Sequence, residues 1–290
     1  MGISYLIHLG VIISIFVILG VSLNMALGYT GLLNLGHIAF YGIGAYTSAI
    51  LTTHYGYSYL VALLSAAILA GCAGLFLTLI TGRLKGDYFA LGTLGFSFVV
   101  YAIFLNWTEL TGGSLGISGI PKPNIFGIEI SSNFSYLIFT LIITTLICWF
   151  LYKLAHSRYG KLLEAIRDDE VGLQSLGKNT SKMKYQIMAL SAALAGIAGS
   201  LYAHYITFID PSTFYLNSII IIVTIVIVGG LASIKGSIAA AIIILLLPEL
   251  LRFLNLPSDV VGPGRQIIYS IVLLLILLYR PRGLFGKVDI

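Results

Sequence analysis

The chain has 290 residues, of which 58% are hydrophobic and 9% are charged, and its mean hydropathy is +1.01. A soluble globular domain is excluded, because so few polar residues cannot cover the surface of a core that large. The net charge of +5 comes from cations that lie between apolar runs. It therefore follows the charge rule for membrane loops and indicates no nucleic-acid partner.

Several apolar runs of about 18 to 23 residues match the roughly 20 that a helix needs to cross the hydrocarbon of a bilayer. We predict an all-α, polytopic transmembrane bundle of about eight to nine spans, forming one domain over 1–290. In chain order, the candidate spans are 5–27, 35–53, 59–81, 88–106, 135–152, 185–206, 214–234, 237–252 and 266–279.

The second span contains the stretch GYTGLLNLGHIAFYGIGAY at 28–46, which is rich in glycine and polar residues. Because glycine has poor helix propensity, we predict a broken or re-entrant helix here. Two interpretations of the polar residues remain open: neighbouring helices satisfy them in a close packing, or they line a wet path through the bundle. The candidate path residues are Asn34, His37, Tyr41, Gly42 and Gly44.

The segment 107–134 is a candidate loop that is long enough to have a function of its own. Its glycine, serine and proline content favours turns over helix. Gly116, Ser118 and Gly119 fit the G-x-S-G pattern of a membrane serine protease, with His204 as a conceivable base. Such matches arise easily by chance in a loop of this composition, so we predict no catalytic residue. No spaced Cys, His or carboxylate accompanies His37 either, and we predict no metal or cofactor site.

The loop 153–184 holds 11 of the 27 charged residues, including the run EAIRDDE at 164–170. Leucines and isoleucines at helical spacing predict a short amphipathic helix from Tyr159 to Gly177, which is well placed as a C-terminal cap. A solvated connector is one explanation. A connector does not need an apolar stripe, however, so the pattern favours a surface that docks on another protein.

In the next candidate span, SAALAGIAGS at 191–200 places small residues four apart, which predicts a close helix-packing face. Alternating the spans puts 13 of the 16 Lys and Arg residues on the side of the loop 153–184. The positive-inside rule then makes that side cytoplasmic, together with the C-terminus. The side of the N-terminus stays open, because residues 1–34 contain no Lys or Arg.

Five stretches together resemble the M-type (LivM-like) permeases of branched-chain amino acid ABC importers. They are GYTGLLNLGHIAFYGIGAYTSAIL at 28–51, LTGGSLGISGIPKP at 110–123, a long block from RYGKLLEAIRDDEVGLQSLGKN at 158–179 to Tyr205, VGGLASIKGSIAAA at 228–241 and YRPRGLFG at 279–286. Gly172 departs from the family pattern, which usually has alanine there. The resemblance implies a permease subunit in a prokaryotic plasma (inner) membrane that forms the path for branched-chain or similar hydrophobic amino acids.

The resemblance also implies the partners: two cytoplasmic ATP-binding cassette subunits, a second homologous permease and an extracytoplasmic solute-binding protein. ATP is then bound by the partner subunits, and the sequence agrees, since each Gly-Lys pair lacks the following Ser or Thr of a P-loop. A secondary transporter or channel for small polar solutes such as urea or amides is the alternative. Ion coupling usually requires ionisable residues deep in the spans, which are not apparent here.

Two further sets of site residues follow from this interpretation. We expect the segment 110–123 to dock the solute-binding protein through Gly112, Gly113, Ser114 and Pro121. We expect the loop 153–184 to receive the ATPase subunits, with two side chains as apolar anchors in a groove of the partner and the rest as orienting charges. The anchors are Leu163 and Ile166, and the charged residues are Glu164, Arg167, Asp168 and Glu170.

Overall fold

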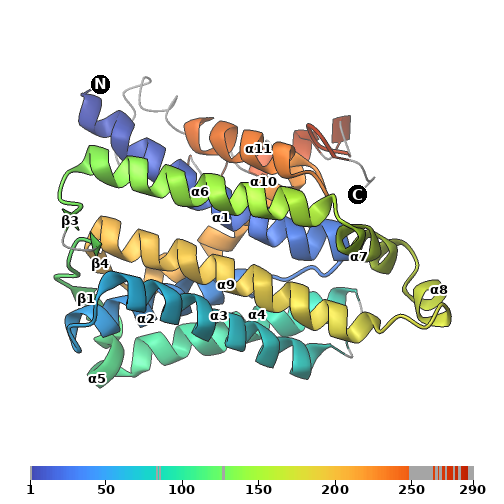
Figure 1. Ribbon diagram of the computed structural model, residues 1–290, viewed down its shortest axis with the longest axis horizontal. Helices are drawn as coiled ribbons and strands as arrows, with labels where there is room; N and C mark the ends of the chain where they lie inside the picture. Colours follow the sequence, from blue (N-terminus) through green and yellow to red (C-terminus); the bar gives the residue numbers. More distant parts are fainter. Residues whose placement is uncertain are drawn as a thin grey trace.

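The computed structural model describes residues 2–247, apart from 83, 85, 126 and 127, together with 264, 267, 270–271, 273–276, 278–279 and 282–286. Within these residues the fold is a bundle of long helices, as predicted, with a few two-residue strands at one end (Figure 1). The long helices are α1 (Ile3–Thr30), α2 (His37–Thr53), α3 (Tyr59–Thr81), α4 (Asp87–Asn106), α6 (Asn133–Ala155), α9 (Thr180–Ile206), α10 (Leu216–Gly229) and α11 (Ile234–Leu246).

The shorter elements gather at the two ends of the bundle (Figure 1). At one end lie α7 (Arg158–Asp168) and α8 (Glu170–Ser175). We call this the α7 end. The opposite end carries α5 (Thr108–Thr111), η1 (Gly113–Leu115), β1 (Ile117–Ser118), β2 (Asn124–Ile125), β3 (Ile128–Glu129), β4 (Phe208–Ile209) and η2 (Pro211–Phe214). Strand β1 pairs antiparallel with β4, and β2 with β3.

Helix α9 lies at the centre of the bundle and packs against α1, α2 and α3. Its small residues permit this: a Cβ added to Gly196 would lie 2.6 Å from the carbonyl oxygen of Ala66 on α3. A Cβ added to Gly44 on α2 would in turn lie 2.2 Å from the carbonyl oxygen of Gly196. Backbones that approach so closely have no room for a side chain, so the predicted packing face on α9 is confirmed.

The chain between α1 and α2 is not helical. Gly31 ends α1 in the left-handed region at φ 71°, and the amides of Gly31 and Leu32 return to the carbonyls of Leu27 and Ala26, at 2.9 and 3.1 Å. This is the usual glycine cap of a helix C-terminus. Residues 31–36 then continue without helix until α2 begins at His37. The predicted span 35–53 is thus interrupted only at its start, and Gly42 and Gly44 lie inside one continuous helix.

Helix α2 begins inside the bundle and not at its edge. His37 Nε2 lies 3.0 Å from the hydroxyl of Ser22, eight residues before the end of α1. At about 1.5 Å per residue, that is about 12 Å into the bundle. The other end of α2 reaches the end opposite α7, where Thr52 lines a cleft together with Pro121. The segment 31–53 therefore passes through the bundle as a nonhelical stretch followed by a helix.

The N-terminal part of α1 lies at the end opposite α7 (Figure 1), where His8 Nδ1 is 3.1 Å from the hydroxyl of Tyr205 near the end of α9. The N-terminal part of the chain therefore lies at the opposite end of the bundle from the loop 153–184, a point that the sequence left open. Among the described residues, six helical segments are long and apolar enough to cross a membrane, against the eight to nine spans expected. Helices α2 and α11 are shorter. Residues 266, 268–269, 272 and 277 of the candidate span 266–279 and residues 248–252 of the candidate span 237–252 lie outside the described residues.

Candidate functional site

The candidate coupling helix is split in two. Instead of one helix from Tyr159 to Gly177, α7 ends at Asp168 and α8 begins at Glu170. Asp169 causes the break, because its carboxylate accepts a 2.9 Å hydrogen bond from the amide of Gly172 and caps α8. A Cβ on Gly172 would lie 2.3 Å from that carboxylate, so the glycine gives the cap room. Gly177, at φ 76°, ends the segment as predicted.

The apolar stripe of α7 faces its own bundle. Leu163 is fully buried and Ile166 is 4% exposed, and both belong to the hydrophobic core that α1 and α6 share. The structure differs here from the expected anchor role, in which both side chains enter a groove of a partner. They hold α7 to the rest of the chain instead.

Arg167 joins α7 to the end of α1. Its Nη1 donates a 2.7 Å hydrogen bond to the carbonyl of Gly28, and its Nε pairs with Asp168 at 2.8 Å. The Gly28 carbonyl belongs to the last turn of α1, where backbone carbonyls lack helical partners and the helix dipole favours a cation. The Arg167 side chain also packs over Gly31, the residue at which the chain leaves α1 for the broken segment.

Glu170 fixes α8 to the start of α9. It forms an ion pair with Lys184, at 2.7 Å between Oε2 and Nζ, and accepts a 3.0 Å hydrogen bond from the Thr180 hydroxyl. In α7, in α8 and at the residue that follows α8, the side chains left facing outward include Asp168, Val171 and Leu176; the two apolar ones are 68% and 77% exposed. Sequence periodicity did not single out Val171. These residues form the outward surface of the α7 end.

The candidate path residues lie in the interior. Asn34 and His37 are fully buried and Tyr41 is 2% exposed. Asn34 Nδ2, His37 Nδ1 and the Tyr41 hydroxyl have no hydrogen-bond partner in the described part of the chain. Gly42 packs against Phe104 and Phe214. The polar groups of this region are therefore only partly satisfied by neighbouring helices.

Apart from tyrosines, the buried polar side chains of the described residues are all Ser, Thr, Asn or His. Among them, Asn24 of α1 bonds to the turn between α10 and α11 through Gly230, Ala232, Ser233 and Ser237. This is a satisfied contact between helices. The described interior thus holds neutral groups or histidine rather than carboxylates or lysines.

The candidate docking segment is a series of turns, as its composition predicted. Gly112 and Gly113 adopt φ of 75° and 58°, which favour glycine, and Gly116 approaches the carbonyl oxygen of Ile209 beside β4. Ser114 and Leu115 project outward, and Leu115 is 83% exposed. The segment thus presents a turn on a scaffold tied to the end of α9.

Asp210 organises the next turn at this end. Burial alone would raise the pKa of its carboxyl, but hydrogen bonds from the side chains and backbone amides of Ser212 and Thr213 hold that pKa below its usual value. The carboxylate is therefore charged at neutral pH. Asp210 stands at the N-terminal cap position of the short helix η2, which packs against α2 and α4, and its carboxylate accepts hydrogen bonds from the hydroxyls of Ser212 and Thr213.

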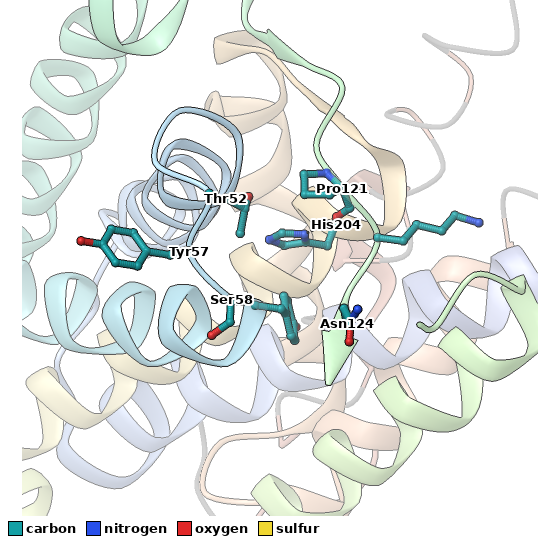
Figure 2. Close-up of a pocket in the computed structure, with 9 residues that line it drawn as sticks. Thr52, Tyr57, Ser58, Pro121, Asn124 and His204 are labelled. Atoms are coloured by element: carbon teal, nitrogen blue, oxygen red, sulfur yellow. Dashed lines mark hydrogen bonds between the residues drawn. The ribbon is translucent and has the colours of Figure 1, made fainter. Parts of the chain in front are cut away.

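A polar cleft of about 380 Å³ opens beside this segment (Figure 2). His204 lies between Thr52 and Pro121 there; its Nδ1 is 2.7 Å from the Pro121 carbonyl and its Nε2 is 2.8 Å from the Ser48 hydroxyl. Both ring nitrogens are thus engaged, and neither bonds to Ser118. The serine-protease interpretation has no geometric support. The cleft is lined by Thr52, Gly56, Tyr57, Ser58, Tyr59, Pro121, Lys122, Asn124 and His204.

With this geometry in view, the comparisons with known proteins identify the family. The family described as the branched-chain amino acid transport system / permease component matches residues 5–279. The chain belongs to this family. It is a polytopic membrane protein and a permease subunit of an ABC-type importer, not an enzyme.

The relatives of this permease include the permease proteins LivM and LivH of branched-chain amino acid transport systems. The chain is 37% identical over 294 residues to the high-affinity branched-chain amino acid transport system permease protein LivM of Escherichia coli K12, covering 93% of this chain and 67% of the relative. It is 26% identical over 296 residues to LivH of Salmonella typhimurium, covering 96% and 93%. The autoinducer 2 import system permease protein LsrC of Salmonella paratyphi B is 29% identical over 213 residues, covering 70% and 58%. No solved structure matches the chain.

Proposed function

We propose that this permease imports branched-chain or similar hydrophobic amino acids as the M-type subunit of a five-component transporter. Two cytoplasmic ATP-binding cassette subunits, a second homologous permease and an extracytoplasmic solute-binding protein are its partners. ATP is bound by the cassette subunits and not by this chain. The identity to LivM over most of the chain supports the substrate class, and the related LsrC shows that the family includes a permease for a different solute.

The observation that carries the coupling role is the link from Arg167 to Gly28. A helix can transmit a displacement only if one face is fixed to the spans and another face is free for the motor. The apolar face of α7 is fixed to α1 and α6, and Arg167 ties it to the turn that leads into residues 31–36. The outward surface with Val171 and Leu176 is free for a cassette subunit.

The path is built around the break before α2. Asn34, His37 and Tyr41 carry polar groups without partners in the described interior, and unsatisfied polar groups at membrane depth are costly unless a cavity or solute serves them. A displacement of α7 would reach this region through Gly31, because the nonhelical residues 31–36 connect the two directly. The segment 110–123 docks the solute-binding protein at the other end.

Co-purification tests this assignment. A tagged chain, coexpressed with the second permease and both cassette subunits, should retain them in detergent. Hydrolysis of ATP by the complex should rise when the solute-binding protein is added with leucine and should not rise with urea or acetamide. A chain that retains no cassette subunit and transports urea alone would support the channel alternative instead.

A further inference from the structure

A second pocket, of about 210 Å³, opens at the α7 end between the end of α1, the end of α6 and the start of α11. We call it the α11 pocket. None of the candidate path residues lines it. The lining residues are Tyr29, Tyr152, His156, Ala232, Ser233, Ile234 and Lys235.

The α11 pocket is a site for a negative group. Its ionisable lining residues among those described are the exposed Lys235 and His156 and the two tyrosines, and none of the described lining residues is a carboxylate. Ser233 caps α11 by accepting a 3.1 Å hydrogen bond from the Gly236 amide. No hydrogen bond joins the amides of Ile234 and Lys235 to another described residue. Free amides at the start of a helix, together with an ammonium group, suit phosphate oxygens.

Tyr29 gives independent evidence for an occupant. Its side chain is 2% exposed and lines the α11 pocket, and its hydroxyl makes no hydrogen bond within the described part of the chain. The hydroxyl is not among the fully enclosed groups without a partner, so it opens into the α11 pocket, where it can donate to an occupant. The charged groups facing it from α7 are one acid, Glu164, and one base, Arg167, so α7 adds little net charge.

The surface beside the α11 pocket has the character of a membrane interface. On α6, the ammonium of Lys153 lies 4.2 Å from the ring centroid of Trp149, and Tyr152 stacks on His156 at 4.1 Å. Trp149 and Tyr152 are exposed. Exposed aromatic and basic residues of this kind are typical of the headgroup level, and the cytoplasmic leaflet is the anionic one.

A separate apolar groove lies on α6, farther from the α7 end than the α11 pocket. It has a volume of about 320 Å³ and is lined by Ile138, Leu141, Ile142, Thr145 and Leu146. Ile138, Ile142 and Thr145 lie three or four residues apart in series with Trp149, Tyr152 and His156, so they share one face of α6. From Tyr152 to Thr145 the helix rises about 10 Å, and an acyl chain spans that distance.

We propose that the α11 pocket binds the phosphate of an anionic phospholipid, with an acyl chain in the groove along α6. Lys235 and the first amides of α11 hold the phosphate oxygens, and the Tyr29 hydroxyl donates to one of them. The lipid belongs to the leaflet at the α7 end. The proposal concerns lipid and does not depend on which solute the permease imports.

Lipid retention tests the proposal. The full chain is placed in nanodiscs that contain equal amounts of phosphatidylglycerol and phosphatidylcholine and is then released into mild detergent. Native mass spectrometry identifies the lipids that remain bound. We expect phosphatidylglycerol to be enriched, and Lys235→Ala to lower this enrichment about fivefold, the effect of one cation near the surface. Tyr29→Phe, which keeps the buried ring, should lower it in part. Lys178→Ala removes an exposed cation at the same end, outside the α11 pocket, and should leave it unchanged.

Equal enrichment in Lys235→Ala and Lys178→Ala would overturn the proposal, as would equal retention of the two lipids by the unmodified chain. A further arm separates lipid from free phosphate. In discs of phosphatidylcholine alone, sodium phosphate should leave the unfolding temperature unchanged. If phosphate raises that temperature in the unmodified chain but not in Lys235→Ala, and no anionic lipid is retained, the occupant is soluble phosphate and the lipid assignment is wrong.

Discussion

Replacing Arg167 with alanine removes the link between α7 and the last turn of α1. The guanidinium loses its 2.7 Å hydrogen bond to the Gly28 carbonyl, and that carbonyl loses its cation. Leu163 and Ile166 still hold α7 to the bundle, because their burial does not involve Arg167. We therefore expect the variant to fold and to keep its cassette subunits, but to transmit their movement poorly to residues 31–36.

The magnitude follows from the contact. A hydrogen bond from a charged group contributes about 1.5–3 kcal/mol. The Arg167 side chain is only 14% exposed, so solvent screening reduces this value little. At about 1.4 kcal/mol per factor of ten, the ratio of linked to unlinked α7 falls about 10- to 140-fold. A transporter that depends on this link should then hydrolyse ATP without moving solute.

The assay counts ATP hydrolysed for each leucine taken up by proteoliposomes that contain the whole transporter. Arg167→Ala should raise this number at least about tenfold, while hydrolysis alone changes little. Lys161→Ala is the matched control: it removes another cation of α7, which is exposed, and should leave this number unchanged. An unchanged number in Arg167→Ala, with full uptake, would refute the role of this link.

Other variants separate packing, docking and charge. Ile166→Asp buries a charge in the chain's own core and should lower its unfolding temperature. Leu176→Asp should release the cassette subunits and leave that temperature unchanged. If Ile166→Asp instead releases the subunits without loss of stability, and Leu176→Asp does not release them, the anchor is Ile166. Gly44→Val should destabilise the α2–α9 contact in detergent, and a normal unfolding temperature would contradict the packing described. Ser114→Trp should reduce receptor-stimulated more than basal hydrolysis, and equal losses would contradict docking there. Asp210→Asn should lower the unfolding temperature at neutral pH, because the pKa of the native carboxyl is below its usual value. The difference in unfolding temperature between the two proteins should vanish as pH falls through that lowered pKa. A difference that does not change with pH would contradict the role of the carboxylate.

Much of the bundle could be predicted from the sequence, because membrane spans are long and their small residues are conspicuous. Helix α3 has the predicted bounds, α4 begins one residue before its predicted range, and Gly196 packs as its spacing indicated. The glycines near His37 predicted a broken helix, but the nonhelical stretch is 31–36, and Gly42 and Gly44 lie inside the continuous helix α2. That α2 begins about 12 Å inside the bundle could not be predicted, since it depends on contacts with Ser22 and Thr93 far away in the chain.

The candidate coupling site was harder to predict. An amphipathic stripe indicates that Leu163 and Ile166 need an apolar partner, but periodicity is the same whether that partner is the chain's own bundle or another protein. The break at Asp169 depends on a cap that competes with a continuous helix, and a run of charges conceals it. The Gly28 carbonyl is a backbone atom, so no side-chain pattern could have indicated that Arg167 binds it.

Uptake of radiolabelled leucine by proteoliposomes that contain this permease, its partner permease and both cassette subunits tests the proposed function most directly. We expect uptake only when ATP is present on the side of α7 and the solute-binding protein is present on the side of the 107–134 loop. Uptake by this chain alone, driven by an ion gradient and indifferent to ATP, would contradict the assignment.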